Sequence, residues 1–279
     1  MASLSESDDR SRRLLTRCPP PQLSLICPYP VPARAVLPEG GDTDKTDNFS
    51  ELGGRGSYAD RVTTNANPMK SGADGTPLIR IWVDPACPWA WQTASWLMDL
   101  RDQGVLTIEW GLFSLEINSS EPGLPFWEAA KLNGEGHVAL ARARHDGGDA
   151  GFERYYAALG QLRHEQRQEM SPELVRKAAI DADMHGLVER ALAQPELPAE
   201  IVAEYQRARA ADVFGVPTLQ LLPSGSPIYG PILPLAPQGE EALAWWTPVK
   251  FALEHPEMYE LKRWPRNRRP GQASPRADG

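Results

Sequence analysis

The pattern of hydrophobic and polar positions changes near residue 76. Over residues 1–75, Pro, Ser, Thr, Asp and Gly predominate, and apolar residues keep no helical or strand period. Such a segment buries too little apolar surface to offset its ordering entropy. We therefore expect a disordered extension at 1–75, an α/β domain at 76–265, and a basic tail at 266–279. We interpret that tail as solvated, with an anion-binding patch as the alternative.

The domain opens with a pattern typical of a β-α-β unit. Apolar runs at 78–83 and 106–113 predict two strands, and the stretch from Pro88 to about Gln103 has the apolar spacing of a helix. The link at Gly104 is too short to be a crossover by itself. The helix is therefore expected to connect two parallel strands.

No strand pattern follows for about 90 residues. Amphipathic helices are predicted instead, near 125–144, 151–168, 171–184 and 197–211. The strand pattern then returns at 216–222, with a short return strand at 227–229 and a closing helix from Glu240 to about His255. We predict a helical subdomain inserted at about 120–213 into an α/β domain.

Composition excludes several functions. The net charge of −8 argues against general nucleic-acid binding, which needs a basic face. No apolar stretch approaches the ~18–20 residues of a membrane span, and prolines interrupt the segment after Arg12-Arg13 that an export signal would need. Three scattered cysteines favour a reducing, cytoplasmic compartment. No metal-ligand, P-loop or dinucleotide motif is present, so we expect no metal and no tightly bound cofactor.

Cys87 is the candidate catalytic residue. It stands in the motif Asp-Pro-Ala-Cys-Pro-Trp-Ala-Trp, between a strand end and a helix start, and Pro88 suits the first helical position. Cys87 then occupies the helix N-cap, where unpaired N–H groups and the helix dipole favour a thiolate. We therefore expect its pKa to lie well below the free value of ~8.5. A buried structural cysteine is the alternative.

This motif resembles the DsbA-like branch of the thioredoxin superfamily. The likeness is strongest to the mycothiol-dependent nitroreductases, while kappa-class glutathione transferases and hydroxychromene-carboxylate isomerases are similar at greater distance. It covers about residues 78–265. The residues that carry it are the Cys87 motif, 113–118, 156–160 with His164, and Gly215-Val216-Pro217-Thr218.

The resemblance implies a thioredoxin fold with an inserted helical subdomain. It also implies that Pro217 is cis and lies against Cys87, so that the Val216 backbone can pair with a bound thiol. A trans proline at a strand edge is the alternative. The remaining substrate-binding candidates are Pro88, Trp89, Asn118 and His164. A turn-forming Asn118 and a solvent-facing His164 are the competing interpretations.

Ala90 departs from the Cys-x-x-Cys pattern of dithiol enzymes. Cys87 cannot form a disulfide three residues away, and the spacing of Cys18 and Cys27 supports no resolving role. We therefore expect a monothiol oxidoreductase in which a small thiol such as mycothiol releases a mixed disulfide. Its substrate is a mixed disulfide or a small electrophile such as a nitroaromatic. A transferase or isomerase and a non-catalytic thioredoxin-like module are the alternatives, and the oligomeric state stays open.

Overall fold

The computed structural model describes residues 75–261 and 270–271. The predicted extension at 1–75, except its last residue, and most of the predicted tail at 266–279 lie outside these residues. Cys18 and Cys27 lie outside them too.

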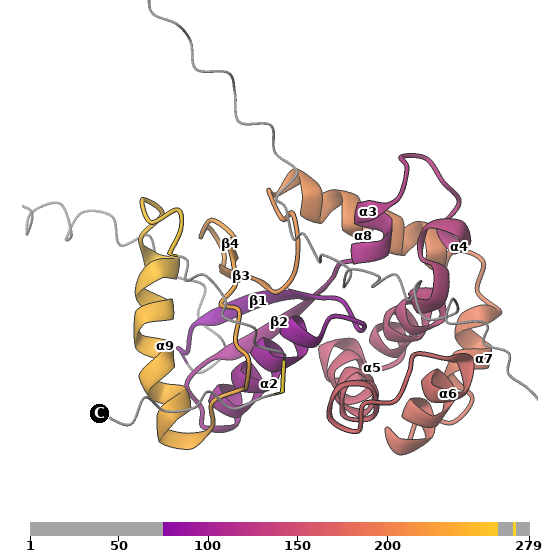
Figure 1. The fold of residues 1–279 in the computed structure, drawn as a ribbon, viewed down its shortest axis with the longest axis horizontal. Coiled ribbons are helices and arrows are strands. Elements are labelled where there is room, and N and C mark those ends of the chain that lie inside the picture. The colour runs from indigo at the N-terminus through magenta and orange to yellow at the C-terminus, as the bar shows by residue number, and fades with distance from the viewer. Residues whose placement is uncertain (1–74, 262–269, 272–279) are drawn as a thin grey trace, which may run out of the picture. The chain divides into compact units, whose positions relative to one another are not determined.

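A four-stranded sheet forms the centre of the described chain (Figure 1). Its strands stand in the order β2-β1-β3-β4. β1 pairs in parallel with β2 and antiparallel with β3, which pairs antiparallel with β4. The strands are β1 (Leu78–Val83), β2 (Thr107–Leu112), β3 (Thr218–Leu221) and β4 (Ile228–Tyr229). This is the sheet of a DsbA-like thioredoxin fold, so the predicted fold class is confirmed.

Helix α2 (Pro88–Asp102) is the crossover between the two parallel strands, as the apolar spacing predicts. It packs on β1 and β2, and α9 (Gly239–Glu254) packs on α2 and β3. Trp96 connects the two helices, because its indole N–H donates to the Ala242 carbonyl at 3.1 Å while its ring contacts Trp246. The middle of α2 is thereby held against α9.

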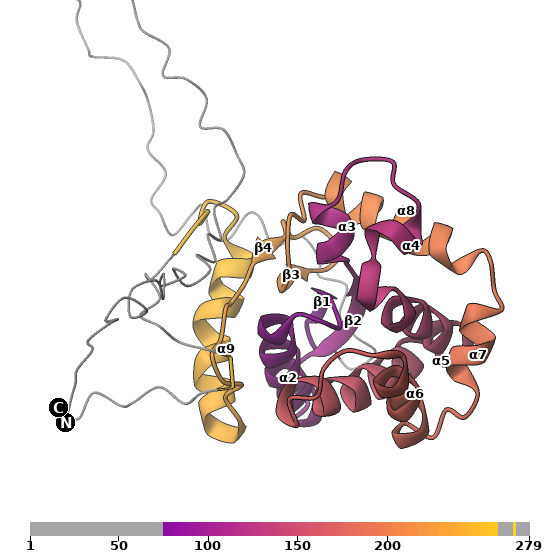
Figure 2. The same cartoon turned by 45° about the vertical axis from the view of Figure 1, so that its right-hand side comes forward.

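The chain between β2 and β3 is helical, as predicted, and lies on the side of the sheet away from α9 (Figures 1 and 2). The short helices α3 and α7 are additions to the predicted helices, whereas the helix predicted near 125–144 is divided into α4, η1 and the first half of α5. The elements are α3 (Leu115–Ser119), α4 (Phe126–Ala129), η1 (Lys131–Asn133), α5 (Gly134–Gly160), η2 (Gln161–Glu165), α6 (Pro172–Asp181), α7 (Leu187–Leu192) and α8 (Leu197–Ala210).

Helix α5 is folded back on itself. Gly147 and Gly148 have non-helical backbone angles, and Gly148 has a φ of +60°, which favours glycine. A Cβ on Gly136 would lie 3.8 Å from the Leu159 side chain, although 23 residues of straight helix would span about 35 Å. The two halves of α5 therefore lie side by side. The break falls between the two helices predicted at 125–144 and 151–168.

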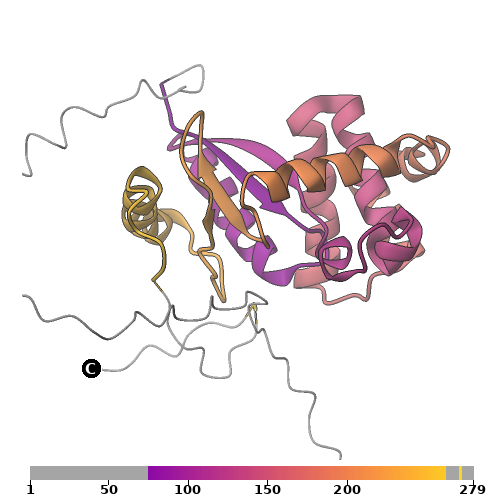
Figure 3. The same ribbon diagram turned by 90° about the horizontal axis from the view of Figure 1, so that it is seen from above.

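The open edge of β2 is closed by the helical insertion. Glu204 of α8 accepts the Leu112 N–H at 2.8 Å and holds Arg144, which donates to the Trp110 carbonyl at 2.8 Å. In Figure 3, α8 is the orange helix that runs beside the strands. These contacts satisfy edge groups that would otherwise be free to pair with another strand. They also fix the helical insertion against the carboxyl end of β2, which pairs with the end of β1 that leads to Cys87.

Candidate functional site

Cys87 lies between β1 and α2 at the N-cap of the helix, where the sequence predicts it. Its φ of −85° and ψ of 110° are extended, and Pro88 begins the helix. The Cys87 sulfur accepts a hydrogen bond from the Ala90 N–H at 3.5 Å. The helix therefore presents one of its unpaired donors to the sulfur, as expected for an N-cap.

The loop before β3 forms the second wall. The Val216–Pro217 peptide bond is cis, as the family resemblance implies, so the trans alternative is wrong. The Cys87 thiol donates to the Val216 carbonyl, with 3.8 Å between sulfur and oxygen. Thr218 secures the loop by donating from its hydroxyl to the Gly215 carbonyl at 2.7 Å. The structure thus brings Cys87, Val216 and Pro217 together from segments about 130 residues apart.

The Cys87 thiol is neutral in this arrangement. Its side chain is buried, and this burial raises its pKa to about 11, while the Ala90 N–H acts in the opposite direction. The charge of Asp84 raises the pKa further. The prediction of a lowered pKa is therefore wrong for this structure. The predicted donors of the helix end are present, but loss of hydration outweighs them.

Asp84 supports the turn before Cys87. Its buried carboxylate accepts the N–H groups of Ala86 and Leu115, each at 2.7 Å. The His137 Nε2 atom lies 3.8 Å away, and both side chains are excluded from solvent. Asp84 thus ties the end of β1 to the start of α3. Neither Asp84 nor His137 was among the site residues predicted from the sequence.

His164 lies behind the same turn. Its Nε2–H donates to the Pro85 carbonyl at 3.0 Å, and its ring stacks on Trp91 with 6.1 Å between centroids. Burial lowers the pKa of His164 to about 4, with the Pro85 hydrogen bond opposing that change. The imidazole is therefore neutral near pH 7 and partly buried. The solvent-facing interpretation is wrong.

The three other predicted substrate-binding residues do not all lie beside the sulfur. Pro88 and Trp89 begin α2 beside the sulfur and are partly exposed. Asn118 lies in α3, one turn after the Ser114 cap, rather than in a turn leaving β2. Its side-chain oxygen accepts from the Tyr205 hydroxyl of α8 at 3.1 Å. Asn118 thus faces an exposed contact between α3 and α8.

Both halves of α5 pack against the Cys87 motif. A Cβ on Gly136 would lie 3.8 Å from the Pro85 ring, whereas a Cβ on Gly160 would overlap the Trp91 ring at 2.1 Å. The Tyr156 ring lies 5.7 Å from the Trp91 ring. These glycines permit α5 to approach the Cys87 motif closely. In the sequence they are recognisable only as small residues on a helix. The α5 wall was therefore not predicted.

A hollow of about 270 Å³ opens beside His164 and Trp91. It combines an aromatic ring, neutral and charged polar groups, and the loop after β4. Its lining includes Trp91, Gln92, Ser95, His164, Arg167 and Leu235. The hollow follows the first two turns of α2, the helix whose N-cap is Cys87.

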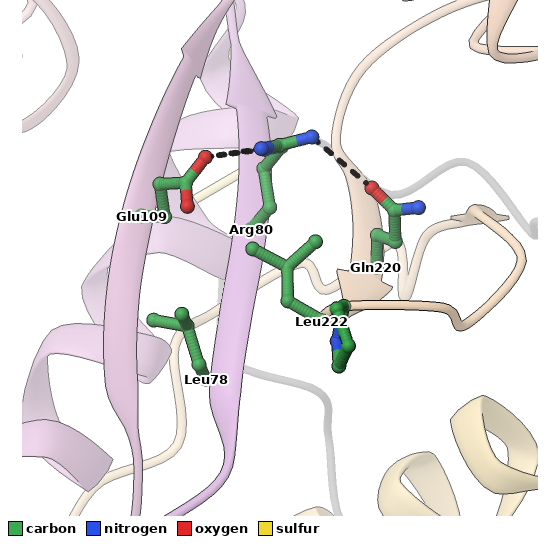
Figure 4. A pocket seen from close by; sticks show the side chains of 6 residues that line it. Leu78, Arg80, Glu109, Gln220 and Leu222 are labelled. Carbon is green, nitrogen blue, oxygen red and sulfur yellow. Dashed lines mark hydrogen bonds and ion pairs between the residues drawn. The ribbon is translucent and has the colours of Figure 1, made fainter. Parts of the chain in front are cut away.

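A second hollow of about 260 Å³ lies at the opposite end of the strands (Figure 4). There Arg80 donates to Glu109 at 2.7 Å and to the Gln220 side chain at 3.4 Å. These polar side chains, one from each of three strands, form hydrogen bonds with one another. Because β1 runs from Leu78 toward Cys87, this hollow is remote from the thiol.

Across residues 75–261 and 270–271, no cluster of His, Cys, Asp and Glu side chains is arranged to hold a metal ion. No helix in that part of the chain has the length and apolar content required to cross a bilayer.

Comparisons with known proteins find relatives of this region. Residues 86–263 match the model of the Rv2466c-like family, described as mycothiol-dependent nitroreductase Rv2466c. The uncharacterized protein Rv2286c of Mycobacterium tuberculosis is 33% identical over 183 residues, which cover 64% of this chain and 79% of that protein.

Two solved structures are also similar. The probable DsbA oxidoreductase SCO1869 from Streptomyces coelicolor is 19% identical, with a TM-score of 0.44, over 67% of this chain and 94% of that one. The cytosolic disulfide reductase DsbM from Pseudomonas aeruginosa with GSH is 12% identical, with a TM-score of 0.43, over 62% and 99%.

Proposed function

Because the chain belongs to the Rv2466c-like family of mycothiol-dependent nitroreductases, we propose that it is a monothiol oxidoreductase acting through Cys87. Membership confirms the resemblance seen in the Cys87 motif and makes the chain an oxidoreductase enzyme. Mycothiol, or a small thiol like it, is the proposed co-substrate. The proposed substrates are mixed disulfides and small electrophiles such as nitroaromatics.

One observation carries the monothiol proposal. Ala90, at the position of the second thiol in Cys-x-x-Cys enzymes, is fully buried and donates its N–H to the Cys87 sulfur. Cys87 is also the only free cysteine among the described residues. A disulfide formed at Cys87 therefore has to be opened by a thiol from outside this part of the chain.

The proposed reduction of a mixed disulfide has two exchange steps. The Cys87 thiolate attacks one sulfur of the substrate, forms a new S–S bond, and releases the other sulfur as a thiolate that takes a proton. A small-thiol thiolate then attacks the outer sulfur of the adduct and releases the Cys87 thiolate. Two electrons pass from the thiols to the substrate disulfide. For a nitroaromatic, two thiols supply two electrons and two protons, giving a nitroso compound, a disulfide and water.

The raised pKa of Cys87 imposes a condition on the first step. The buried thiol must lose its proton before it attacks, because the thiolate is the nucleophile. We propose that ligand binding brings solvent or polar groups to the sulfur and so offsets its burial. The hydrogen bond from the Ala90 N–H then becomes the dominant influence on the Cys87 pKa and favours the thiolate. The attack rate should then rise with pH well above neutrality.

The hollow beside His164 is the proposed binding site for the non-sulfur part of a ligand. Trp91 offers an aromatic face there, Arg167 offers hydrogen-bond donors, and neutral His164, whose Nε2–H is held by Pro85, offers its Nδ1 atom as an acceptor. Trp89, partly exposed beside the sulfur, is proposed to stack on aromatic substrates. Pro88 and the Val216–Pro217 loop would shape the groove, and Asn118 would contact ligands that extend toward α3.

The protonated state of Cys87 favours one second candidate. In a transferase or isomerase of the kappa-class type, a neutral Cys87 would donate a hydrogen bond to a bound thiolate, as it now donates to Val216. In that reaction Cys87 forms no covalent adduct. We propose a cytoplasmic location for either enzyme, because the reaction consumes a reduced small thiol. We further propose residues 76–265 as the catalytic domain.

Intact-protein mass spectrometry distinguishes the two. We expect the full chain, with Cys18 and Cys27 replaced by serine, to form a one-to-one adduct with a small-thiol disulfide, which the small thiol then removes. The same chain with Cys87→Ser should form none. Turnover of a nitroaromatic or thiol substrate with no adduct at Cys87 at any stage would reject the monothiol route in favour of the transferase.

A further inference from the structure

Tyr156 carries a buried hydroxyl that has no hydrogen-bond partner among the described residues. The neighbouring Tyr155 is equally buried, but its hydroxyl donates to the Val175 carbonyl at 3.1 Å. Buried polar groups are nearly always paired, because an unpaired one has lost water and gained nothing. A phenylalanine at position 156 would fill the same space without that cost. The Tyr156 hydroxyl therefore needs a hydrogen-bond partner that is not found within residues 75–261 and 270–271.

The surroundings of Tyr156 indicate which partner that is. Its ring is held between Trp91, Trp110 and Phe152, with centroid separations of 5.7, 5.4 and 6.1 Å. Trp91 belongs to the first turn of α2, and its N–H donates to the Cys87 carbonyl at 3.1 Å. Tyr156 is thus packed against the turn that holds the reactive sulfur, and its ring cannot easily move.

The charges that raise the pKa of Tyr156 belong to the same turn. Burial raises the pKa of Tyr156 well above its usual range, and negative charge on Cys87 or Asp84 raises it further. For Tyr155 the charge with that effect is Glu135. Tyr156 therefore keeps its proton at every working pH and acts only as a neutral hydrogen-bond donor toward an anion.

We propose that the Tyr156 hydroxyl is a hydrogen-bond donor to the sulfur anion that forms at Cys87, directly or through one water molecule. This inference rests on the proposed monothiol function. When a small thiolate opens the Cys87 adduct, the S–S bond breaks and its electron pair stays on the Cys87 sulfur. Tyr156 and the Ala90 N–H then stabilise that anion together, and no proton leaves Tyr156.

The need for such a donor follows from the other groups around Cys87. Asp84, backed by His137, is an acidic neighbour, and the Val216 carbonyl is an acceptor. His164 is neutral and directed to the Pro85 carbonyl. Only the Ala90 and Trp89 N–H groups favour the anion from within α2. Tyr156 supplies a donor from α5, the element packed against this turn.

The test compares Tyr156→Phe with Tyr155→Phe in the full chain lacking Cys18 and Cys27. Two quantities are measured: the pH midpoint of Cys87 alkylation by iodoacetamide, and the rate at which N-acetylcysteine removes its own mixed disulfide from Cys87. Tyr156→Phe should raise the midpoint by about one pH unit and slow release about tenfold, since hydrogen bonds to charged groups are the strong ones. Its melting temperature should not fall.

Tyr155→Phe serves as the matched control. It should lower the melting temperature by leaving the Val175 carbonyl unpaired, and it should leave both Cys87 measurements unchanged. An unchanged midpoint and release rate in Tyr156→Phe would overturn the inference. If no mixed disulfide forms in the parent chain, the proposed function fails, but the alkylation midpoint still decides whether Tyr156 stabilises the thiolate.

Discussion

The backbone N–H of Ala90 points at the Cys87 sulfur from 3.5 Å, so the residue that replaces a second thiol contacts the first. Residues three apart on a helix have Cβ atoms about 5–6 Å apart. A cysteine at position 90 would therefore lie close to the range of disulfide geometry. It would be buried, as Ala90 is.

Ala90→Cys should change the reaction type. An internal disulfide would compete with the external thiol because an intramolecular partner has a high effective concentration. We expect the small-thiol adduct, stable in the parent, to become short-lived, and dithiol oxidation of a reduced unfolded protein to appear. Ala94→Cys, one turn further along α2, is the control and should gain no such activity. Efficient dithiol turnover by the parent without Cys18 and Cys27 would contradict the monothiol mechanism.

Cys87 should make the fold less stable at high pH. Its folded pKa is about 11, above the ~8.5 of a free thiol. Between these values the unfolded chain has lost the proton and the folded chain retains it, so unfolding becomes more favourable as pH rises. Between pH 9 and 11, we expect the free energy of unfolding of the parent to fall by about 3 kcal/mol more than that of Cys87→Ser.

Urea denaturation of both proteins at several pH values measures this difference. Tyrosines and lysines titrate in both chains, so only the difference between them reports on Cys87. Curves that stay parallel up to pH 11 would mean that the thiol is solvated in solution.

His164 should have the opposite effect in acid. The pKa of His164 is about 4 in the folded chain and ~6.5 when unfolded. Between pH 6.5 and 4 the unfolded chain binds a proton that the folded chain does not, so stability falls as pH falls. His164→Gln keeps an N–H donor for the Pro85 carbonyl but has no imidazole to protonate. We therefore expect its free energy of unfolding to fall by up to about 3 kcal/mol less than that of the parent over this pH range.

The control is His145→Gln, which changes an exposed histidine of α5. Its acid denaturation should follow that of the parent. If His164→Gln also follows the parent, the imidazole is accessible to solvent protons and its stacking on Trp91 is loose.

Two glycines of α5 should respond differently to the same substitution. Gly160→Ala would place a Cβ 2.1 Å from the Trp91 ring, and the fold should lose about 1–3 kcal/mol of stability. Gly136→Ala meets only ordinary contacts at 3.8 Å and gains helix propensity, so its stability should equal or exceed that of the parent. Thermal unfolding and tryptophan fluorescence measure both. Equal melting temperatures for the two variants would show that Trp91 is free to move.

Local patterns predicted the strands, the crossover helix and the N-cap position of Cys87. Each depends on neighbours in the sequence, such as Pro88 after Cys87 or the apolar run at 78–83. The resemblance then gave the cis Pro217. The ionisation of Cys87 could not be predicted this way, because the burial that raises its pKa depends on tertiary contacts such as that with Val216, which is 129 residues away in the chain.

The polar groups that surround Cys87 were missed for the same reason. His137 and Tyr156 stand in helical stretches where any polar or aromatic residue would fit the pattern. Their position follows from the fold-back at Gly147 and Gly148, a tertiary event signalled only by two adjacent glycines. Asp84 was visible beside the motif, but its partner Leu115 is 31 residues away.

The fold-back of α5 also sets the order in which this chain can assemble. Its two halves meet after a loop of about 20 residues, whereas β1 must wait for β3 across 140 residues, and Cys87 for Val216 across 129. Closing the shorter loop costs less entropy, so the helical hairpin is expected to form before the sheet is complete. During that interval the thiol lacks its cover at Val216. A newly made chain thus exposes its one described cysteine to cellular oxidants until the last strands dock, and thiol capping during synthesis would itself block completion of the fold.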